Sequence, residues 1–200
     1  MGADSFGAFD FAVDYNVPTG QKSALRINFH SDTLENHRDY YDGDRYGFNP
    51  TLRLEISPAT TLDLSYEHAD HERFIDRGVP TLNGEPVEAF EDIVFGDTDT
   101  NLQTLRADIY RANLSHEFSE TSKGNLVIQY SDFQKLYKNY YASGYSGGDT
   151  FTADGYLDPT ERNNLILSGN VVNEFQTGSV KHTLLAVSYT HLTLPTNTVV

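Results

Sequence analysis

The sequence contains no cysteine, so the chain can form neither a disulfide framework nor a thiolate metal site. Basic residues are also scarce, because 14 Lys and Arg stand against 29 Asp and Glu and leave a formal charge of −15. Nucleic-acid binding depends on Lys and Arg contacts to phosphate, and this balance therefore argues against a nucleic-acid partner. No run of about 18 apolar residues occurs, and we expect no transmembrane helix.

Signals for export and for catalysis are missing as well. Residues 1–6 have neither the basic region nor the apolar core of a signal peptide. Because the chain opens directly into a strand pattern, we expect the true N-terminus to lie upstream. No nucleophile-elbow motif, phosphate-binding loop or motif-anchored Ser-His-Asp set occurs. We therefore expect that the protein is not an enzyme and carries no cofactor.

The sequence does contain about eight stretches with the period-two alternation of β-strands. In the first stretch Phe9, Phe11 and Val13 share one face, whereas Asp10 and Asp14 share the other. Several stretches reach about 10 residues or more, which exceeds the usual soluble strand of about 5–6 residues and suits a membrane-spanning strand. The expected strands cover residues 7–17, 23–32, 45–56, 61–73, 105–118, 123–141, 163–175 and 180–187.

Tight and long gaps alternate between these strands. The tight gaps lie at residues 18–21, 57–60, 119–122 and 176–178, and the long gaps lie at 33–44, 74–104 and 142–162. Outer-membrane barrels have short turns on the periplasmic side and long loops outside. The pattern therefore predicts an all-β antiparallel meander with strands paired in chain order. All short turns should lie at one end and all long loops at the other.

The apolar faces of these strands need either lipid or a second sheet to cover them. In a barrel they would form one continuous lipid-facing surface, which would be exposed in an isolated chain. The side chains that we expect on this surface are Phe9, Phe11, Val13, Leu25, Ile27, Leu52, Leu54, Leu62, Leu64, Leu126 and Ile128. Two alternatives stay open: a small structural or adhesive outer-membrane barrel, and a soluble β-sandwich that binds carbohydrate.

The C-terminal segment has a different character. Residues 187–196 read as the translation, in one frame, of a transposon-type sequencing adapter. We therefore expect residues 187–200 to be a non-native, adapter-like tail, and we set it apart from residues 1–186 as one would an expression scar. The alternative is an ordinary Thr-rich strand that ends at Pro195.

Four segments resemble a known family. They are residues 44–52, 76–87, 95–97 and 181–186, which read DRYGFNPTL, DRGVPTLNGEPV, FGD and KHTLLA. In this combination and order they resemble TonB-dependent siderophore receptors, especially the ferrichrome-type subgroup.

The resemblance implies an outer-membrane barrel of about 22 antiparallel strands, closed around an N-terminal plug domain. Residues 1–186 would supply about eight of these strands, as a partial barrel domain. The whole receptor would bind and take up a ferric siderophore, which is cargo and not a resident cofactor. The expected partners are this siderophore, the TonB complex acting through a plug that these residues do not include, and outer-membrane lipid.

Aromatic residues in the long loops and at the outer strand ends are the candidate ligand contacts. Their alternative role is an interfacial aromatic belt, because Tyr suits a site that is apolar on one side and wet on the other. Arg77 is a candidate for a different reason, since a cation pairs with an anionic ferric chelate. The residues that we expect to contact ligand are Tyr40, Tyr41, Arg77, Tyr137, Tyr141 and Tyr145.

Two segments superficially suggest a metal site. His68 and His71 lie three apart on an expected strand and should therefore point to opposite faces. Asp97, Asp99 and Asn101 resemble part of a calcium loop, but the glycine and the distal Glu of that motif are missing. We expect no metal site at either segment.

Overall fold

The computed structural model describes residues 1–194 of the chain, with side chains as far as Thr193. Nine strands form one antiparallel sheet, while β6 and β7 form a separate two-stranded ribbon. The elements are β1 (Gly2–Ala3), β2 (Phe9–Gly20), β3 (Ser23–Glu35), β4 (Asp42–Ser57), β5 (Thr60–Phe74), β6 (Thr81–Leu82), β7 (Glu85–Pro86), the 3-10 helix η1 (Glu88–Phe90), β8 (Leu102–Ser119), β9 (Ser122–Gly144), β10 (Thr152–Thr177) and β11 (Val180–Leu194).

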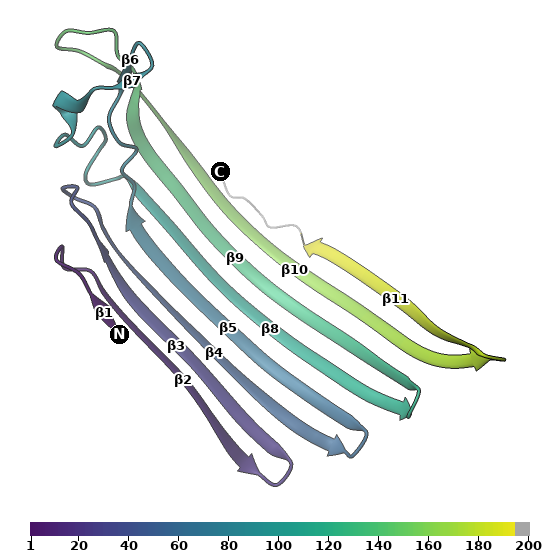
Figure 1. The fold of residues 1–200 in the computed structure, drawn as a ribbon. Coiled ribbons are helices and arrows are strands. Elements are labelled where there is room, and N and C mark those ends of the chain that lie inside the picture. Colours follow the sequence, from purple (N-terminus) through teal and green to yellow (C-terminus); the bar gives the residue numbers. More distant parts are fainter. Residues whose placement is uncertain (195–200) are drawn as a thin grey trace.

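The strand order confirms the predicted meander. The sheet runs β1-β2-β3-β4-β5-β8-β9-β10-β11, so every strand pairs with its neighbour in the chain apart from the small ribbon in the loop. Four hairpin turns, at residues 21–22, 58–59, 120–121 and 178–179, lie together at one end of the sheet (Figure 1). Loops 36–41, 75–101 and 145–151 lie at the opposite end.

The hairpin turns are tight because each contains two residues. In the last of them Gly178 has φ +61°, a conformation that a two-residue hairpin favours and that glycine adopts without a steric penalty. Such turns fix the register of the strands that they join. Three of the hairpins carry a register irregularity beside the turn, at Pro18–Gly20, Glu55–Ser57 and Glu117–Ser119, and the ladders run regularly beyond it.

The strands extend further into the loop end than predicted. The largest error concerns the expected loop 142–162, because residues 142–144 belong to β9 and residues 152–162 to β10. Gly155 and Pro159 lie inside β10, although both residue types are unfavourable within strands. Gly155 allows a close contact, because a Cβ there would lie 2.5 Å from Cδ1 of Tyr140. Pro159 pairs with Leu136 in the ladder.

The apolar side chains form one continuous face, as predicted. Residues directly opposite one another in an antiparallel pair project from the same face. One such row crosses the sheet through Leu25, Leu52, Leu64, Ala112, Ile128 and Leu167. None of the side chains predicted to face lipid is buried. A lipid-facing surface therefore accounts for these residues.

A row of tyrosines borders this apolar face on the side of the loops. Tyr66, Tyr110 and Tyr130 are register partners, with ring centroids 4.9 Å apart for the first pair and 6.4 Å for the second. Tyrosines at such a boundary match the aromatic girdle of an outer-membrane barrel. Tyr130 consequently lies on the lipid-facing side.

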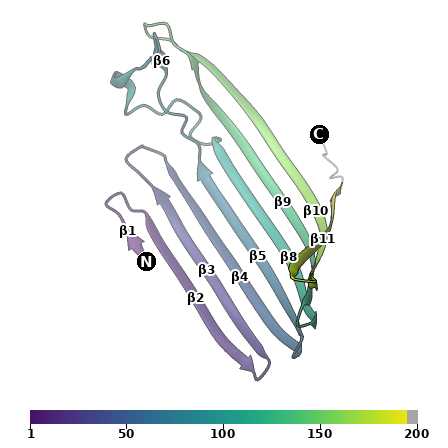
Figure 2. The ribbon, with the colours of Figure 1, turned by 45° about the vertical axis from the view of Figure 1, so that its right-hand side comes forward.

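No second sheet covers either face of the described residues. The buried apolar side chains are few, namely Phe74, Ile75, Phe95 and Ala107, and most of them lie at the loop end. The sheet is one curved layer, which Figure 2 shows from a second direction. This architecture is not the β-sandwich that we kept as an alternative, because a sandwich buries its apolar faces between two sheets.

The described sheet is open and not closed. β1 pairs with β2 alone and β11 with β10 alone, so both outer edges are free within residues 1–194. The predicted adapter-like tail, residues 187–200, begins within β11, which continues to Leu194, and residues 195–200 lie outside the described part of the chain. Within residues 1–194, no helix has the length and apolarity needed to cross a membrane.

Candidate functional site

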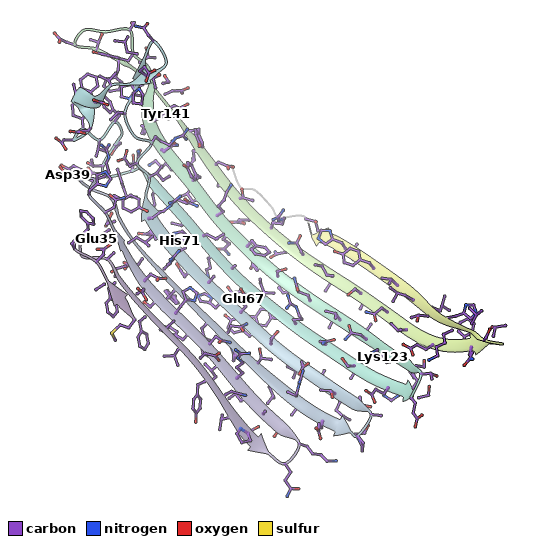
Figure 3. All side chains as sticks on the ribbon, viewed as in Figure 1. Glu35, Asp39, Glu67, His71, Lys123 and Tyr141 are labelled. Atoms are coloured by element: carbon purple, nitrogen blue, oxygen red, sulfur yellow. The ribbon has the colours of Figure 1, made fainter. Side chains whose placement is uncertain are left out.

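The second face of the sheet is polar and passes beneath the long loops. Figure 3 shows Tyr141 at the loop end of this sheet, Glu67 and His71 further along it, and Lys123 at the turn end. Tyr137 and Tyr141 belong to β9 and lie diagonally across the ladder from Tyr156 of β10, whose direct partner is Asn139. Arg77 comes from loop 75–101 and meets these rings. We refer to Arg77, Tyr137, Tyr141 and Tyr156 as the Arg77 cluster.

The contacts within the Arg77 cluster are specific. The guanidinium donates a hydrogen bond to the Tyr156 hydroxyl at 3.1 Å and lies over the Tyr141 ring, with Cζ 4.7 Å from the centroid. Tyr137 and Tyr156 stack, with centroids 5.5 Å apart and an interplanar angle of 7°. A cation over a tyrosine face is attracted by the ring quadrupole. The cluster therefore presents one positive charge within a wall of aromatic rings.

Arg77 stays protonated and positively charged. Burial alone would lower the pKa of Arg77, but the hydrogen bond to Tyr156 and the neighbouring Tyr137 outweigh it, and the net shift is upward. Arg77 is exposed in spite of these contacts. It can therefore meet an anion that enters from the loop side.

A buried ion pair holds the segment that carries Arg77. Nε of Arg38, in loop 36–41, lies 2.6 Å from Oδ2 of Asp76, and the two side chains are only 14% and 7% exposed. The same guanidinium donates to the carbonyl oxygens of Glu91 and Ile93. The hydrogen bond to Asp76 raises the pKa of Arg38. Loop 36–41 is thereby tied to the start of loop 75–101 and to residues 91–93 within it.

Asp76 also accepts a hydrogen bond from the backbone. Its Oδ1 accepts a hydrogen bond from the Gly78 amide at 2.8 Å, and this bond closes a short turn around Arg77. Gly78 has φ +76°, which a residue with a side chain rarely adopts. The position of Arg77 thus depends on residues on both sides of it.

Asn101 anchors the other end of the loop. Its amide donates to the carbonyl oxygens of Ile75 and Tyr140, and its oxygen accepts from the Tyr140 amide at 2.8 Å. The side chain is buried, and all these partners are backbone groups. Asn101 therefore has a structural role, and Asp97 and Asp99 form a local turn in which Oδ1 of Asp97 accepts the Asp99 amide.

Tyr145, Tyr40 and Tyr41 lie apart from the Arg77 cluster. Tyr145 packs edge-on against Phe90, with centroids 5.3 Å apart, and its hydroxyl donates to the Gly148 carbonyl at 3.0 Å. Tyr40 is 64% exposed and has φ 64°, while the Tyr41 amide donates to the Arg38 carbonyl. These three residues line the outer loops and not the wall below them.

The two histidines occupy opposite faces, as their spacing predicted. His68 lies on the apolar side near the tyrosine row, with Nδ1 2.8 Å from Oδ1 of Asp108. Tyr66 donates to that same oxygen. His71 pairs in the ladder with Arg45 and Leu105 and projects from the polar face. The two imidazoles therefore cannot share one ligand.

The sequence approach found three members of the Arg77 cluster and missed the fourth. Tyr156 lay in a segment that we assigned to a loop, so its register could not be read. The register of β9 and β10 brings Tyr156 next to Tyr137. If the predicted strand had been continued through Gly155, the pairing with β9 would have placed Tyr156 beside Tyr137.

Comparison with known proteins agrees with this architecture. No family model matches the chain. The metal-pseudopaline receptor CntO of Pseudomonas aeruginosa is 25% identical over 193 residues, which cover 92% of this chain and 26% of that protein. The catecholate siderophore receptor Fiu of Escherichia coli is 21% identical over 197 residues, covering 85% of this chain and 26% of Fiu.

Solved receptors show the same fold. The ferripyoverdine receptor of the Pseudomonas aeruginosa outer membrane matches with a TM-score of 0.85 and 14% identity, over 96% of this chain and 26% of that chain. The ferric preacinetobactin receptor BauA of Acinetobacter baumannii matches with a TM-score of 0.81 and 16% identity, over 94% of this chain and 28% of that chain.

Sequence relatives and structural neighbours together support the TonB-dependent siderophore receptor family. The open sheet has the fold of a portion of these receptor barrels, and the bacterial outer membrane is its location. The chain spans 26% of the length of the curated relatives that it matches. The ferrichrome-type subgroup is not confirmed, because these matches are receptors for other chelates.

Proposed function

We propose that this chain forms part of a receptor that captures a metal-loaded siderophore at the cell surface and takes it up. The observation that carries the proposal is the Arg77 cluster, in which one cation and three tyrosine rings meet on the polar face beneath the outer loops. The names of the relatives, which include receptors for ferric siderophores and for metal-pseudopaline, support the same ligand class.

The chemistry of the Arg77 cluster suits a bulky anionic chelate. Its rings offer flat apolar surface at a low cost in conformational entropy. The guanidinium supplies a positive charge in a chain whose formal charge is −15, so a chelate would otherwise be repelled. Tyr40, Tyr41 and Tyr145 stay predictions as first contacts at the rim of the loops. The metal in this scheme is cargo and requires no protein ligand.

Transport requires parts beyond these 200 residues. We infer from the family that energy reaches the receptor through the TonB complex and a plug domain inside the barrel. The apolar face and its tyrosine row would contact outer-membrane lipid. The protein is then a receptor and transporter and not an enzyme, which agrees with the character of its relatives.

The choice among chelates is a finer proposal. A ferrichrome-type ligand stays a prediction from the sequence resemblance alone. One of the curated relatives reported above is a metal-pseudopaline receptor, so a metal-pseudopaline chelate is the second candidate.

The test is a binding assay on cells that display the full-length receptor. We would titrate a ferric catecholate, ferripyoverdine, ferrichrome and metal-loaded pseudopaline, and compare the parent with Arg77→Ala. We expect one of the four to bind saturably and Arg77→Ala to weaken it by about tenfold or more, because an arginine anchor in a binding site contributes about 2 kcal/mol. Arg26→Ala, which removes an exposed arginine on the polar face, is the matched control.

Two outcomes would contradict the proposal. One is the absence of saturable binding for all four chelates when surface display is normal. The other is an equal loss of affinity in Arg77→Ala and Arg26→Ala, which would indicate a general effect of charge and not a site.

A further inference from the structure

Asn139 is a buried amide without hydrogen-bond partners. Its residue is only 1% exposed, yet neither Oδ1 nor Nδ2 meets a partner among the described residues. Three half-buried side chains among the described residues, His71, Thr100 and Asn163, each leave one polar atom unpaired, whereas the fully buried Asn139 leaves two. Buried polar groups in native proteins are nearly always satisfied, so this exception calls for a cause.

The surroundings of Asn139 connect it to the Arg77 cluster. Asn139 lies midway between Tyr137 and Tyr141 on β9 and therefore projects from the same face. Its direct partner on β10 is Tyr156. Arg77 lies over the ring of Tyr141 and donates to the hydroxyl of Tyr156, and these are two of the three tyrosines on this face beside Asn139. The register therefore places Asn139 among the three tyrosines of the Arg77 cluster.

Local folding does not explain an amide at this position. Asn is unfavourable in strands, and a buried amide without partners destabilises the folded protein. Asn101 shows what a structural asparagine does in the same region, because its side chain makes hydrogen bonds to Ile75 and to both backbone groups of Tyr140. Asn139 makes no such bonds and so contributes nothing comparable to the fold.

We propose that Asn139 is a ligand-binding residue whose amide pairs with the chelate once the chelate has drawn Arg77 away from the rings. The amide both donates and accepts, so it fits a ligand group with the same dual character, such as the secondary amide of a peptide-like siderophore. This inference rests on the proposed function, because it assigns a role within the same site.

A substitution by leucine separates binding from stability. Leucine has the branched shape of asparagine and the same number of heavy atoms but no polar atom, so Asn139→Leu removes the amide proposed to pair with the chelate without opening a cavity. In the full-length receptor we expect the chelate that binds best among the four named above to lose roughly tenfold or more in affinity. The thermal midpoint of the ligand-free receptor should stay the same or rise, because the unpaired amide is gone.

Asn101→Leu is the control for a structural amide. It breaks hydrogen bonds present in the free protein, and its thermal midpoint should therefore fall. If Asn139 had a purely structural role, for example through a bridging water, both variants would lower the thermal midpoint. A fall in Asn101→Leu without a fall in Asn139→Leu would therefore exclude that role.

The outcomes separate this inference from the proposed function. Unchanged affinity in Asn139→Leu, with weakened binding in Arg77→Ala, would overturn the role of Asn139 and leave the Arg77 cluster in place. Unchanged affinity in both variants would overturn the proposed site altogether. A lower thermal midpoint in Asn139→Leu, whatever its affinity, would show that the amide stabilises the free receptor and would also overturn the inference.

Discussion

Tyr140 and Tyr141 are adjacent in sequence but serve opposite faces of the sheet. Tyr141 meets Arg77 on the polar side, whereas Tyr140 is 49% exposed on the other side and has only its backbone in the anchoring network of Asn101. Tyrosines that cluster in the sequence therefore do not all share one function. The alternation along β9 divides them between the lipid-facing side and the Arg77 cluster.

At this residue scale we predict different effects for two tyrosines. Tyr145→Ala should weaken chelate binding by about 1–3 kcal/mol, because it removes a ring that packs on Phe90 and shapes the rim of the loops. Tyr130→Ala should leave binding unchanged, because its side chain lies in the row that faces lipid. The measurement is the dissociation constant on intact cells. Equal affinities for the parent and Tyr145→Ala would assign Tyr145 to loop packing alone.

Part of the site followed from the sequence, and the physical reason for the rest is clear. Arg77, Tyr137 and Tyr141 were found because residue type and position near a loop are local properties. Tyr156 and Asn139 were missed because their roles depend on the register between β9 and β10, which is a relation between two segments. The unpaired state of Asn139 is visible only when all its neighbours are placed.

At the scale of elements, the loops are joined by side chains and not by regular secondary structure. Arg38 links loop 36–41 to Asp76, Glu91 and Ile93. Both side chains of the ion pair are largely buried, so loss of one partner leaves the other charge unpaired. This contact decides whether the segment that carries Arg77 is ordered.

We predict that Arg38→Gln loosens this segment. Amide hydrogen exchange at residues 75–79 should become at least about tenfold faster, because a hydrogen-bonded ion pair that shields them is lost. Arg26→Gln is a matched control, since it removes a bidentate pair with Asp14 on an exposed part of the sheet. An exchange rate at residues 75–79 that is the same in Arg38→Gln and in the parent would refute the role of this ion pair.

A charged substitution should destabilise the receptor more on the apolar face of a strand than on its polar face. Ile128 belongs to the apolar row that crosses the sheet, while its neighbour Val127 projects from the polar face. Ile128→Arg should destabilise the receptor in a bilayer by about 2–4 kcal/mol, the cost of an arginine near the middle of the membrane. Val127→Arg should cost much less. Urea titration of the full-length receptor in vesicles measures both, and equal costs would contradict the assignment of the faces.

The strands could be predicted from the sequence because strand alternation and tight turns both depend on residues that are close together in the chain. Alternation over a few residues indicated where β2 to β5 lie, and the two-residue turns then dictated their order. The ends of the strands were less predictable, since pairing with a long neighbour extends a strand through residues such as Pro159 that are unfavourable in isolation. Tertiary pairing outweighs local preference there.

At the scale of the whole molecule, residues 1–194 are an open sheet with two free edges. Unpaired backbone groups are not tolerated in the hydrocarbon region, and exposed edges promote aggregation. We therefore predict that the 200-residue chain on its own neither inserts stably nor binds chelate. Electrophoresis with and without heating, after refolding into detergent, should show no heat-modifiable compact form. A protease-resistant species that migrates fast before heating would contradict this.

The location of every two-residue turn at one end has a consequence for how such receptors change over generations. Each hairpin begins and finishes at the loop end, as β2–β3, β4–β5, β8–β9 and β10–β11 do. Duplication or deletion of a whole hairpin would leave every other strand pointing the same way. Deletion of one strand would turn all later loops toward the periplasm. Gene segments that encode hairpins are therefore the exchangeable units, which agrees with the even strand numbers of bacterial barrels.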